Sequence, residues 1–191
     1  MGDYPRIITE GILRRSAVAI ALTEEDEIIL EVRSGSLDQQ PGDICLPGGG
    51  VESGETPDET VIREMTEELL IDNRQIEGVD PVSIFVTGSQ EIHIFRCRVN
   101  DYTGTFHTDE VAEILKVPLT FLKRTEPELY DIMWIPEMSE DFPFEKIYGG
   151  RDYAWREQRS RVRFYEYGRH VIWGITARIL EDFVDMQYSS K

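Results

Sequence analysis

The sequence predicts an α/β (α+β) domain built on a mixed β-sheet. Short, strand-like apolar segments alternate with two clearly helical ones along the chain. Both helical segments carry apolar residues at the i, i+3, i+4 spacing of helices that pack one face against a core. The chain has 191 residues, of which 40% are hydrophobic, and this is enough for one core of ordinary size. We therefore expect a single domain over residues 1–191.

The N-terminal half begins with a short lead-in over residues 1–15 that has no clear assignment. Residues 16–22 and 27–33 are apolar segments on either side of an acidic turn, which predicts a β-hairpin. Residues 34–43 follow as a polar loop with a Pro-Gly pair. The short apolar piece 44–46 then runs into a loop of consecutive glycines.

A helix is predicted over residues 57–70. Thr56 is a suitable N-cap, Pro57 suits the first helical position, and Glu59 completes a Thr-x-x-Glu capping box. Val61, Met65 and Leu69 recur every four residues, with Ile62 beside them, so that one stripe of the helix faces the core.

The C-terminal half alternates further strands with less regular segments. Residues 81–87 and 91–99 predict two strands around a Gly-Ser turn, and residues 111–122 mix extended and helical signals. Residues 123–160 are rich in aromatics and prolines without periodicity, and we interpret them as an insertion or lid-like segment. Residues 161–167 are a strand candidate.

The last predicted helix carries an apolar stripe that we interpret as core, together with the nearby Trp173. Its members follow helical spacing: Ile172, Ile175, Thr176, Ile179, Leu180, Phe183 and Val184.

The charge of the chain excludes several classes of function. With 37 acidic and 20 basic residues, its net charge is −17, which disfavours non-specific binding to nucleic acid or to an anionic membrane. No apolar run approaches the roughly 20 residues of a membrane span, and no targeting signal is visible, so we expect a cytoplasmic protein. Cys45 and Cys97 lie in apolar surroundings and are interpreted as buried free thiols, with one disulfide left open.

Three carboxylates on the helix over 57–70 suggest chemistry. Glu64, Glu67 and Glu68 share one stripe, and like charges placed so closely repel one another unless cations compensate them. Hard oxygen ligands suit Mg²⁺ or Mn²⁺. A solvated acidic face is the usual explanation of such a cluster. The glycine-rich loop before the helix argues against it here, since its backbone can approach a metal or a phosphate.

Residues 49–71 resemble the Nudix box, G-x5-E-x7-R-E-U-x-E-E-x-G-U with U aliphatic. The matching residues are Gly49, Glu55, Arg63, Glu64, Met65, Glu67, Glu68 and Ile71. The one departure is Leu70, where the family has glycine at the helix end. We expect altered helix termination there, with the chemistry intact.

The resemblance implies a Nudix fold, which is an α/β/α sandwich around a mixed sheet, and hydrolysis of a diphosphate bond in a nucleotide derivative. It also assigns catalytic roles: Glu64, Glu67 and Glu68 as metal ligands helped by the Gly48 carbonyl, and Glu55 with Arg63 as a supporting pair. Bound Mg²⁺ or Mn²⁺ would activate a water for in-line attack on phosphorus. The general base would be a box glutamate or a downstream one, Glu110 or Glu113.

Two flanking segments are similar to Nudix coenzyme A pyrophosphatases. Residues 29–49 resemble their signature L-L-T-x-R-S/A-x3-R-x3-G-x3-F-P-G-G, and residues 165–180 resemble their final strand and helix. This similarity implies that Arg33, Ser34, Gly48 and Gly49 bind substrate. The signature departs at Asp38, which replaces an arginine, and at Leu46, which replaces phenylalanine. An arginine-rich stretch could restore the lost charge, or simply be solvated: Arg151, Arg156, Arg159, Arg161 and Arg163.

The leading hypothesis is therefore metal-dependent hydrolysis of coenzyme A or acyl-CoA to 3′,5′-ADP and (acyl-)4′-phosphopantetheine. One alternative keeps the chemistry but takes ADP-ribose, nucleotide sugars or dinucleoside polyphosphates as substrate, motivated by Asp38. The other is a non-catalytic Nudix-fold ligand sensor. The expected partner is a small nucleotide substrate, not nucleic acid or a membrane, and a homodimer is left open.

Overall fold

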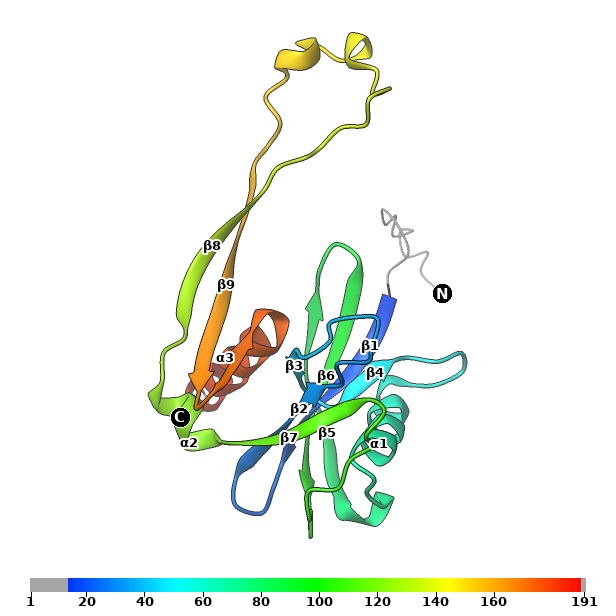
Figure 1. Ribbon diagram of the computed structural model, residues 1–191, viewed down its shortest axis with the longest axis vertical. Helices are drawn as coiled ribbons and strands as arrows, with labels where there is room; N and C mark the ends of the chain where they lie inside the picture. Colours follow the sequence, from blue (N-terminus) through cyan, green and yellow to red (C-terminus); the bar gives the residue numbers. More distant parts are fainter. Residues whose placement is uncertain (1–13, 190–191) are drawn as a thin grey trace, which may run out of the picture.

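The computed structural model describes residues 14–189, so the predicted lead-in lies outside the described residues except for its last two positions. The larger of the two sheets is built around β1 (Arg14–Leu22), as Figure 1 shows. The other strands of this sheet are β2 (Glu27–Arg33), β3 (Ile44–Cys45), β4 (Gly48–Gly50), β5 (Ile76–Val86), β6 (Gln90–Val99) and β7 (Val111–Pro118).

The strand pairing makes this sheet mixed, as predicted. β1 and β2 form the expected antiparallel hairpin, and β5 and β6 form the second one. β1 and β6 run parallel, while β4 pairs with β1 and β7 pairs with β2 in antiparallel fashion. The order β3-β2-β1-β6-β5 places β1 near the centre of the sheet, next to β4.

Two helices cover opposite faces of this sheet: α1 (Pro57–Glu68) and α3 (Gly174–Ser189). Ala17, Ala19 and Ala21 of β1 pack in the cluster that contains the apolar stripe of α1. The alternate residues Ile20 and Leu22 pack in the cluster that contains α3. From Ala17 to Leu22 the strand is apolar, because both of its faces are covered there. The predicted α/β/α sandwich is confirmed.

The C-terminal region forms a second, three-stranded sheet. Its strands are β8 (Glu128–Trp134), β9 (Gln158–Tyr167) and β10 (His170–Trp173). The strand predicted at 161–167 is therefore confirmed within β9, but Ile172 lies in β10 and not in the last helix. Trp173 is 44% exposed and Ile175 is 39% exposed, so their assignment to the core was wrong. A β-strand precedes α3 directly, and this moves both side chains to the protein surface.

Residues 123–160 include much of a long hairpin that projects from the body of the molecule (Figure 1). Its strand β8 was not recognised in the sequence, because all seven of its residues are exposed and no alternation of polar and apolar side chains results. The short helices of the chain are α2 (Leu119–Arg124) before the hairpin, η1 (Asn73–Gln75) after α1, and η2 (Phe144–Lys146) and η3 (Gly150–Asp152) near its tip. The lid-like role of this segment stays a prediction.

Both cysteines are free thiols. Cys97 is buried with its sulfur 3.6 Å from that of Met65, as predicted, whereas Cys45 is half-buried. Burial raises the pKa of both thiols to about 12, which makes them unreactive. Within residues 14–189, no helix combines the length and apolar character needed to cross a bilayer.

Helix α1 ends at Glu68, two residues before the predicted end, and Leu70 follows the C-cap with φ of 52°. This is the left-handed conformation in which helices commonly end, usually with glycine. The altered termination expected from Leu70 is thus not seen: leucine adopts the backbone conformation that suits glycine, and its side chain is 54% exposed.

We expect Leu70→Gly to stabilise the protein, because a left-handed conformation costs an L-residue about 1–2 kcal/mol and costs glycine almost nothing. A net gain of about 1 kcal/mol raises Tm by roughly 2–4 °C in a domain of this size. Leu70→Ala is the matched control, since alanine keeps the Cβ and the strain. Thermal unfolding of wild type, Leu70→Gly and Leu70→Ala measures the effect. A lower Tm for Leu70→Gly than for wild type would contradict the proposed backbone strain at Leu70.

Candidate active site

The loop between β4 and α1 leads into a well-specified helix start. The carboxylate of Glu59 accepts hydrogen bonds from the backbone N–H and the hydroxyl of Thr56, at 2.8 and 2.9 Å. Pro57 occupies the first turn, as predicted. Within the loop, the Glu55 carboxylate accepts bonds from the Glu52 N–H and the Thr60 hydroxyl. These contacts hold the loop and the first turns of α1 as one unit.

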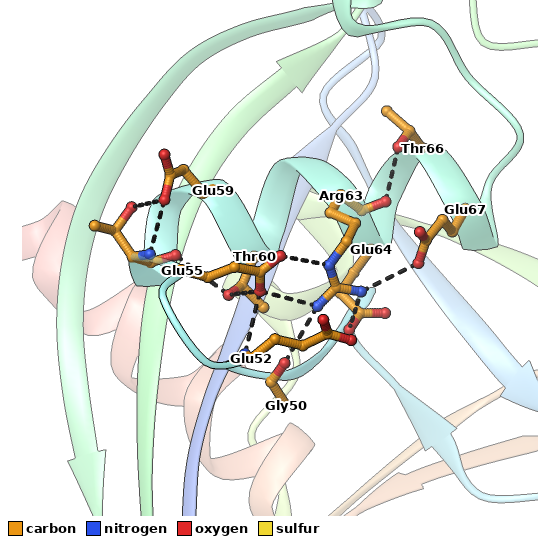
Figure 2. Close-up of polar contacts among 10 residues, drawn as sticks. Gly50, Glu52, Glu55, Glu59, Thr60, Arg63, Glu64, Thr66 and Glu67 are labelled. Carbon is orange, nitrogen blue, oxygen red and sulfur yellow. Dashed lines mark hydrogen bonds and ion pairs between the residues drawn. The ribbon is translucent and has the colours of Figure 1, made fainter.

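Arg63 is the centre of this unit (Figure 2). Its guanidinium lies 2.7 Å from Glu55, 2.9 Å from Glu64 and 3.1 Å from Glu67, and it also donates to the Gly50 carbonyl. The expected pairing of Arg63 with Glu55 is therefore present, and Arg63 also pairs with Glu67, four residues further along the helix. Hydrogen bonding from Arg63 lowers the pKa of Glu55 to about 2, so that carboxylate is ionised at neutral pH. One cation thus fixes three carboxylates.

Within residues 14–189, no cation forms an ion pair with Glu68. Its side chain is buried, and its carboxylate accepts a hydrogen bond of 2.9 Å from the backbone N–H of Gly48. Burial raises the pKa of Glu68 well above its usual range, and burial also raises that of Glu64. The Glu67 side chain is 59% exposed at the edge of the group. The three predicted metal ligands therefore occupy three different environments, from buried to solvent-facing.

The glycines of β4 allow the helix to approach the sheet. A Cβ on Gly49 would lie 2.5 Å from Cδ of Glu64, so the carboxylate of Glu64 rests directly against the backbone of Gly49. A Cβ on Gly48 would overlap the backbone of Ala17 and Val18 in β1. The glycine positions are thus required by two separate close approaches.

Glu31 of β2 was not predicted as a site residue. Together with Glu64, Glu67 and Glu68 of α1 it forms what we call the acidic group. Glu31 is 2% exposed, and the charges of Glu68, Glu110 and Glu64, added to burial, raise its pKa well above the usual range. One sign was present in the sequence: Glu31 interrupts an otherwise apolar strand, 28–32. A charged residue within a buried strand is rare unless it is paired or functional.

The loop after β6 brings one candidate base to this group. The His107 N–H donates to the Glu68 carbonyl at 2.7 Å, and the Thr105 hydroxyl donates to the Leu69 carbonyl, so the loop caps the C-terminus of α1. Glu110 follows on this loop, exposed and close enough to raise the pKa values of Glu64 and Glu68. Glu113 instead pairs with Arg169 at 2.7 Å.

A cavity of about 410 Å³ opens beside the glycines of β4. Three of the four predicted substrate-binding residues line this cavity: Arg33, Gly48 and Gly49. The hydroxyl of the fourth, Ser34, shares a hydrogen bond with the Ser36 hydroxyl in the loop that follows β2. The loop over 34–43 is exposed at Asp38. The far wall is formed by Trp173, Ile175 and other residues around the start of α3: Gly174, Thr176 and Ile179.

Three of the five arginines of the arginine-rich stretch, Arg159, Arg161 and Arg163, line a neighbouring cavity, and none of the five lines the cavity beside β4. The two cavities share Gly174 and Ile175. Each of these three arginines pairs with an acidic residue, in chain order Glu157, Asp131 and Glu181.

The acidic group fits a divalent cation by the chemistry of its donors. Its members are hard carboxylate oxygens, of which one, Glu31 Oε1, is buried without a hydrogen-bond partner among the described residues. Buried anions in such number call for a counter-ion. Within residues 14–189 no three His, Cys, Asp or Glu side chains are already spaced as a finished metal site. Cation binding would therefore draw these carboxylates together.

Comparison with known proteins finds Nudix proteins both among family models and among relatives. The NUDIX domain model matches residues 13–137. The uncharacterized Nudix hydrolase NudL of Pectobacterium atrosepticum is 28% identical over 156 residues, which cover 80% of this chain and 71% of NudL. A peroxisomal coenzyme A diphosphatase of Mus musculus is 29% identical over 125 residues, which cover 60% of this chain and 49% of that protein. This chain thus spans about half the length of the mouse relative.

A crystal structure of a Deinococcus radiodurans protein matches the fold with a TM-score of 0.50 at 25% identity. The match covers 62% of this chain and 78% of the other.

Proposed function

Because this chain belongs to the NUDIX domain family, whose hydrolases act on phosphoric anhydride bonds, we propose that it hydrolyses the diphosphate bond of coenzyme A or acyl-CoA. The products are 3′,5′-ADP and (acyl-)4′-phosphopantetheine, and the cofactor is Mg²⁺ or Mn²⁺. One observation carries the proposal: Arg33 lines the cavity together with Gly48 and Gly49, and these two glycines contact the carboxylates of Glu68 and Glu64. An anion contact therefore lies close to the predicted metal ligands. The coenzyme A diphosphatase among the relatives supports the substrate class.

The site residues have two roles, which are metal binding and positioning. Glu64, Glu67 and Glu68, with the Gly48 carbonyl, would hold the cation, which supplies neutralisation of the phosphate oxygens and a more acidic water. Arg63 and Glu55 position the loop and Glu64 through their ion pairs. The ion pair with Arg63, at 2.9 Å, favours the orientation in which Glu64 rests against Gly49.

Glu110 is the better candidate for the general base. It is exposed, stands beside the acidic group, and can take a proton from a water that attacks phosphorus. Glu113 is held by Arg169 and approached by His170 at 3.4 Å, so its carboxylate is already engaged. The identity of the base stays a proposal.

The far wall of the cavity suits a nucleotide or pantetheine group. Trp173 is partly exposed, with one face stacked on Phe164 at 5.8 Å between ring centroids and the rings almost parallel. An aromatic platform of this kind can receive a base or an apolar chain. Cytoplasmic location and a homodimer stay predictions.

Substrate comparison tests this proposal. We expect kcat/KM with Mg²⁺ or Mn²⁺ to be at least about tenfold higher for coenzyme A than for ADP-ribose or a nucleotide sugar, since a lost charged contact costs roughly 1.5–3 kcal/mol. A preference for ADP-ribose would instead establish the alternative that Asp38 motivates. No hydrolysis of any diphosphate would leave the ligand-sensor hypothesis.

Arg33→Gln locates the anion contact. We expect kcat/KM for coenzyme A to fall about 10–100-fold, because a charge-assisted contact to phosphate is removed. If Arg33 contacts the 3′-phosphate, the loss is much smaller for 3′-dephospho-coenzyme A; if it contacts the diphosphate, both substrates lose equally. The matched control is Arg74→Gln, whose side chain is 89% exposed and pairs with Asp72 away from the cavity. Unchanged kinetics in Arg33→Gln would contradict the contact.

A further inference from the structure

Glu31 is a buried acid that the proposed reaction does not yet use. It lies on β2 with 2% of its surface exposed, and its Oε1 has no hydrogen-bond partner among the described residues. Ile29, two residues earlier on the strand, packs in the core cluster of α1. Because alternate residues of a strand point to the same face, Glu31 points toward α1 as well.

The groups that face Glu31 are mostly acidic or neutral. Glu68 and Glu64 approach from α1, and Glu110 approaches from the loop before β7. Cys45 of β3 and Ile114 of β7 are its neighbours across the sheet. Tyr102 is also near, since the charge of Glu31 contributes to the raised pKa of its hydroxyl.

Arg33 is the one cation that acts on Glu31 among the groups described, and it does not neutralise the acid. Two nitrogens of its guanidinium donate to the Gln39 carbonyl, at 3.3 and 3.1 Å. Burying an ionised carboxylate without a partner costs several kcal/mol. An ordinary core position would hold an apolar side chain or a fully hydrogen-bonded one.

We propose that Glu31 is a further ligand of the divalent cation, so that the metal is held between strand β2 and helix α1. This inference rests on the proposed function, because it extends the metal site of that reaction from α1 and the Gly48 carbonyl of β4 to strand β2. Oε1 of Glu31 is buried without a hydrogen-bond partner among the described residues, and Glu64, Glu68 and Glu110 lie close enough for their charges to act on Glu31. A hard cation placed among these acids would satisfy them together.

The consequence is a metal site that joins two parts of the fold. The carboxylates of α1 and the Gly48 carbonyl would hold the cation between the helix and β4. With Glu31 included, binding also ties β2 to this unit, and metal should therefore stabilise the protein even without substrate.

Mn²⁺ binding by Glu31→Gln tests the proposal, without substrate and with the whole chain. Calorimetry and electron paramagnetic resonance measure the affinity, and thermal unfolding with and without Mn²⁺ gives the shift in Tm. We expect Glu31→Gln to bind Mn²⁺ at least about tenfold more weakly than wild type and to lose most of the metal-induced rise in Tm. Glu27→Gln is the matched control, because Glu27 lies on the same strand and face but outside the acidic group.

Glu31→Met separates a ligand from a structural acid. If Glu31 is a ligand, metal-free Glu31→Met should have a Tm at or above that of wild type, since an apolar side chain replaces a buried acid whose Oε1 has no partner among the described residues. Its Mn²⁺ affinity should fall as in Glu31→Gln. A lower metal-free Tm with unchanged Mn²⁺ affinity in both variants would overturn the inference alone. No Mn²⁺ binding by the wild-type protein would overturn the proposed function as well.

Discussion

Glu68→Gln is expected to lower kcat at least about 100-fold while the protein remains folded. Glu68 is the buried carboxylate of the box helix, and it accepts a hydrogen bond of 2.9 Å from the Gly48 N–H. Glutamine keeps that bond through its amide oxygen but cannot supply the negative charge a divalent cation needs. Loss of a preorganised electrostatic group of this kind removes about 10²–10³ in kcat. Steady-state kinetics with Mg²⁺ and coenzyme A measure the effect.

The same substitution is expected to stabilise the metal-free protein at neutral pH. Burial raises the pKa of Glu68 from its ordinary value of 4.5 to about 8. Between pH 4.5 and about pH 8, the folded state therefore binds more protons than the unfolded state. Stability of the metal-free wild type therefore falls as pH rises above about 4.5. Glu68→Gln removes this contribution, and its Tm should exceed that of wild type increasingly from pH 5 to pH 8. Mg²⁺ should reverse the order by stabilising the wild type alone.

Asp58→Asn is the control on the same helix, because Asp58 is exposed in the first turn of α1 and outside the acidic group. It should retain wild-type kcat and the wild-type response of Tm to Mg²⁺. Wild-type turnover in Glu68→Gln would refute the assignment of Glu68 as a metal ligand. If metal-free Glu68→Gln had a lower Tm than metal-free wild type at pH 8, the protein itself would compensate the charge of Glu68.

The parts of the fold that could be predicted are those with local signals. The hairpin of β1 and β2 follows from two apolar segments around an acidic turn, and the start of α1 follows from Thr56, Pro57 and Glu59. The pairing of Arg63 with Glu67 follows from their spacing of four residues. Each of these depends on neighbours within a few residues, so the sequence alone contains the cause.

The parts that could not be predicted depend on distant partners. β8 has no buried face and pairs with β9 across a long connection, so it shows no alternation. Trp173 lies beside the helical stripe in the sequence, but β10 pairs with β9 and ends just before α3, so Trp173 lies on a cavity wall. Glu31 joins the acidic group only in the folded protein, where β2 lies close to Glu64 and Glu68 of α1.

The three glycines of β4 are expected to respond differently to the same substitution. Gly48→Ala should destabilise the protein by at least about 3 kcal/mol, or roughly 6–12 °C in Tm, because overpacking and backbone strain act together. The added Cβ would overlap the Ala17 carbonyl and lie 2.7 Å from the Cα of Val18, and Gly48 has a φ of 147° that other residues rarely adopt. Neither obstacle is a side chain that can rotate away. Thermal unfolding measures the loss.

Gly49→Ala should instead leave Tm within about 2 °C of wild type and reduce kcat about 10–100-fold. Its Cβ meets the end of the flexible Glu64 side chain, which can rotate away at small energetic cost but then no longer faces the acidic group. Gly50→Ala is the control within the same strand, since no atom lies within 4 Å of its Cβ and its φ is not positive. If Gly49→Ala lost stability as Gly48→Ala does, or if Gly50→Ala lost activity, the triplet would act as one flexible loop. Separate outcomes at three adjacent positions would show that each glycine answers a different contact: one with the sheet, one with a predicted metal ligand, and one with solvent.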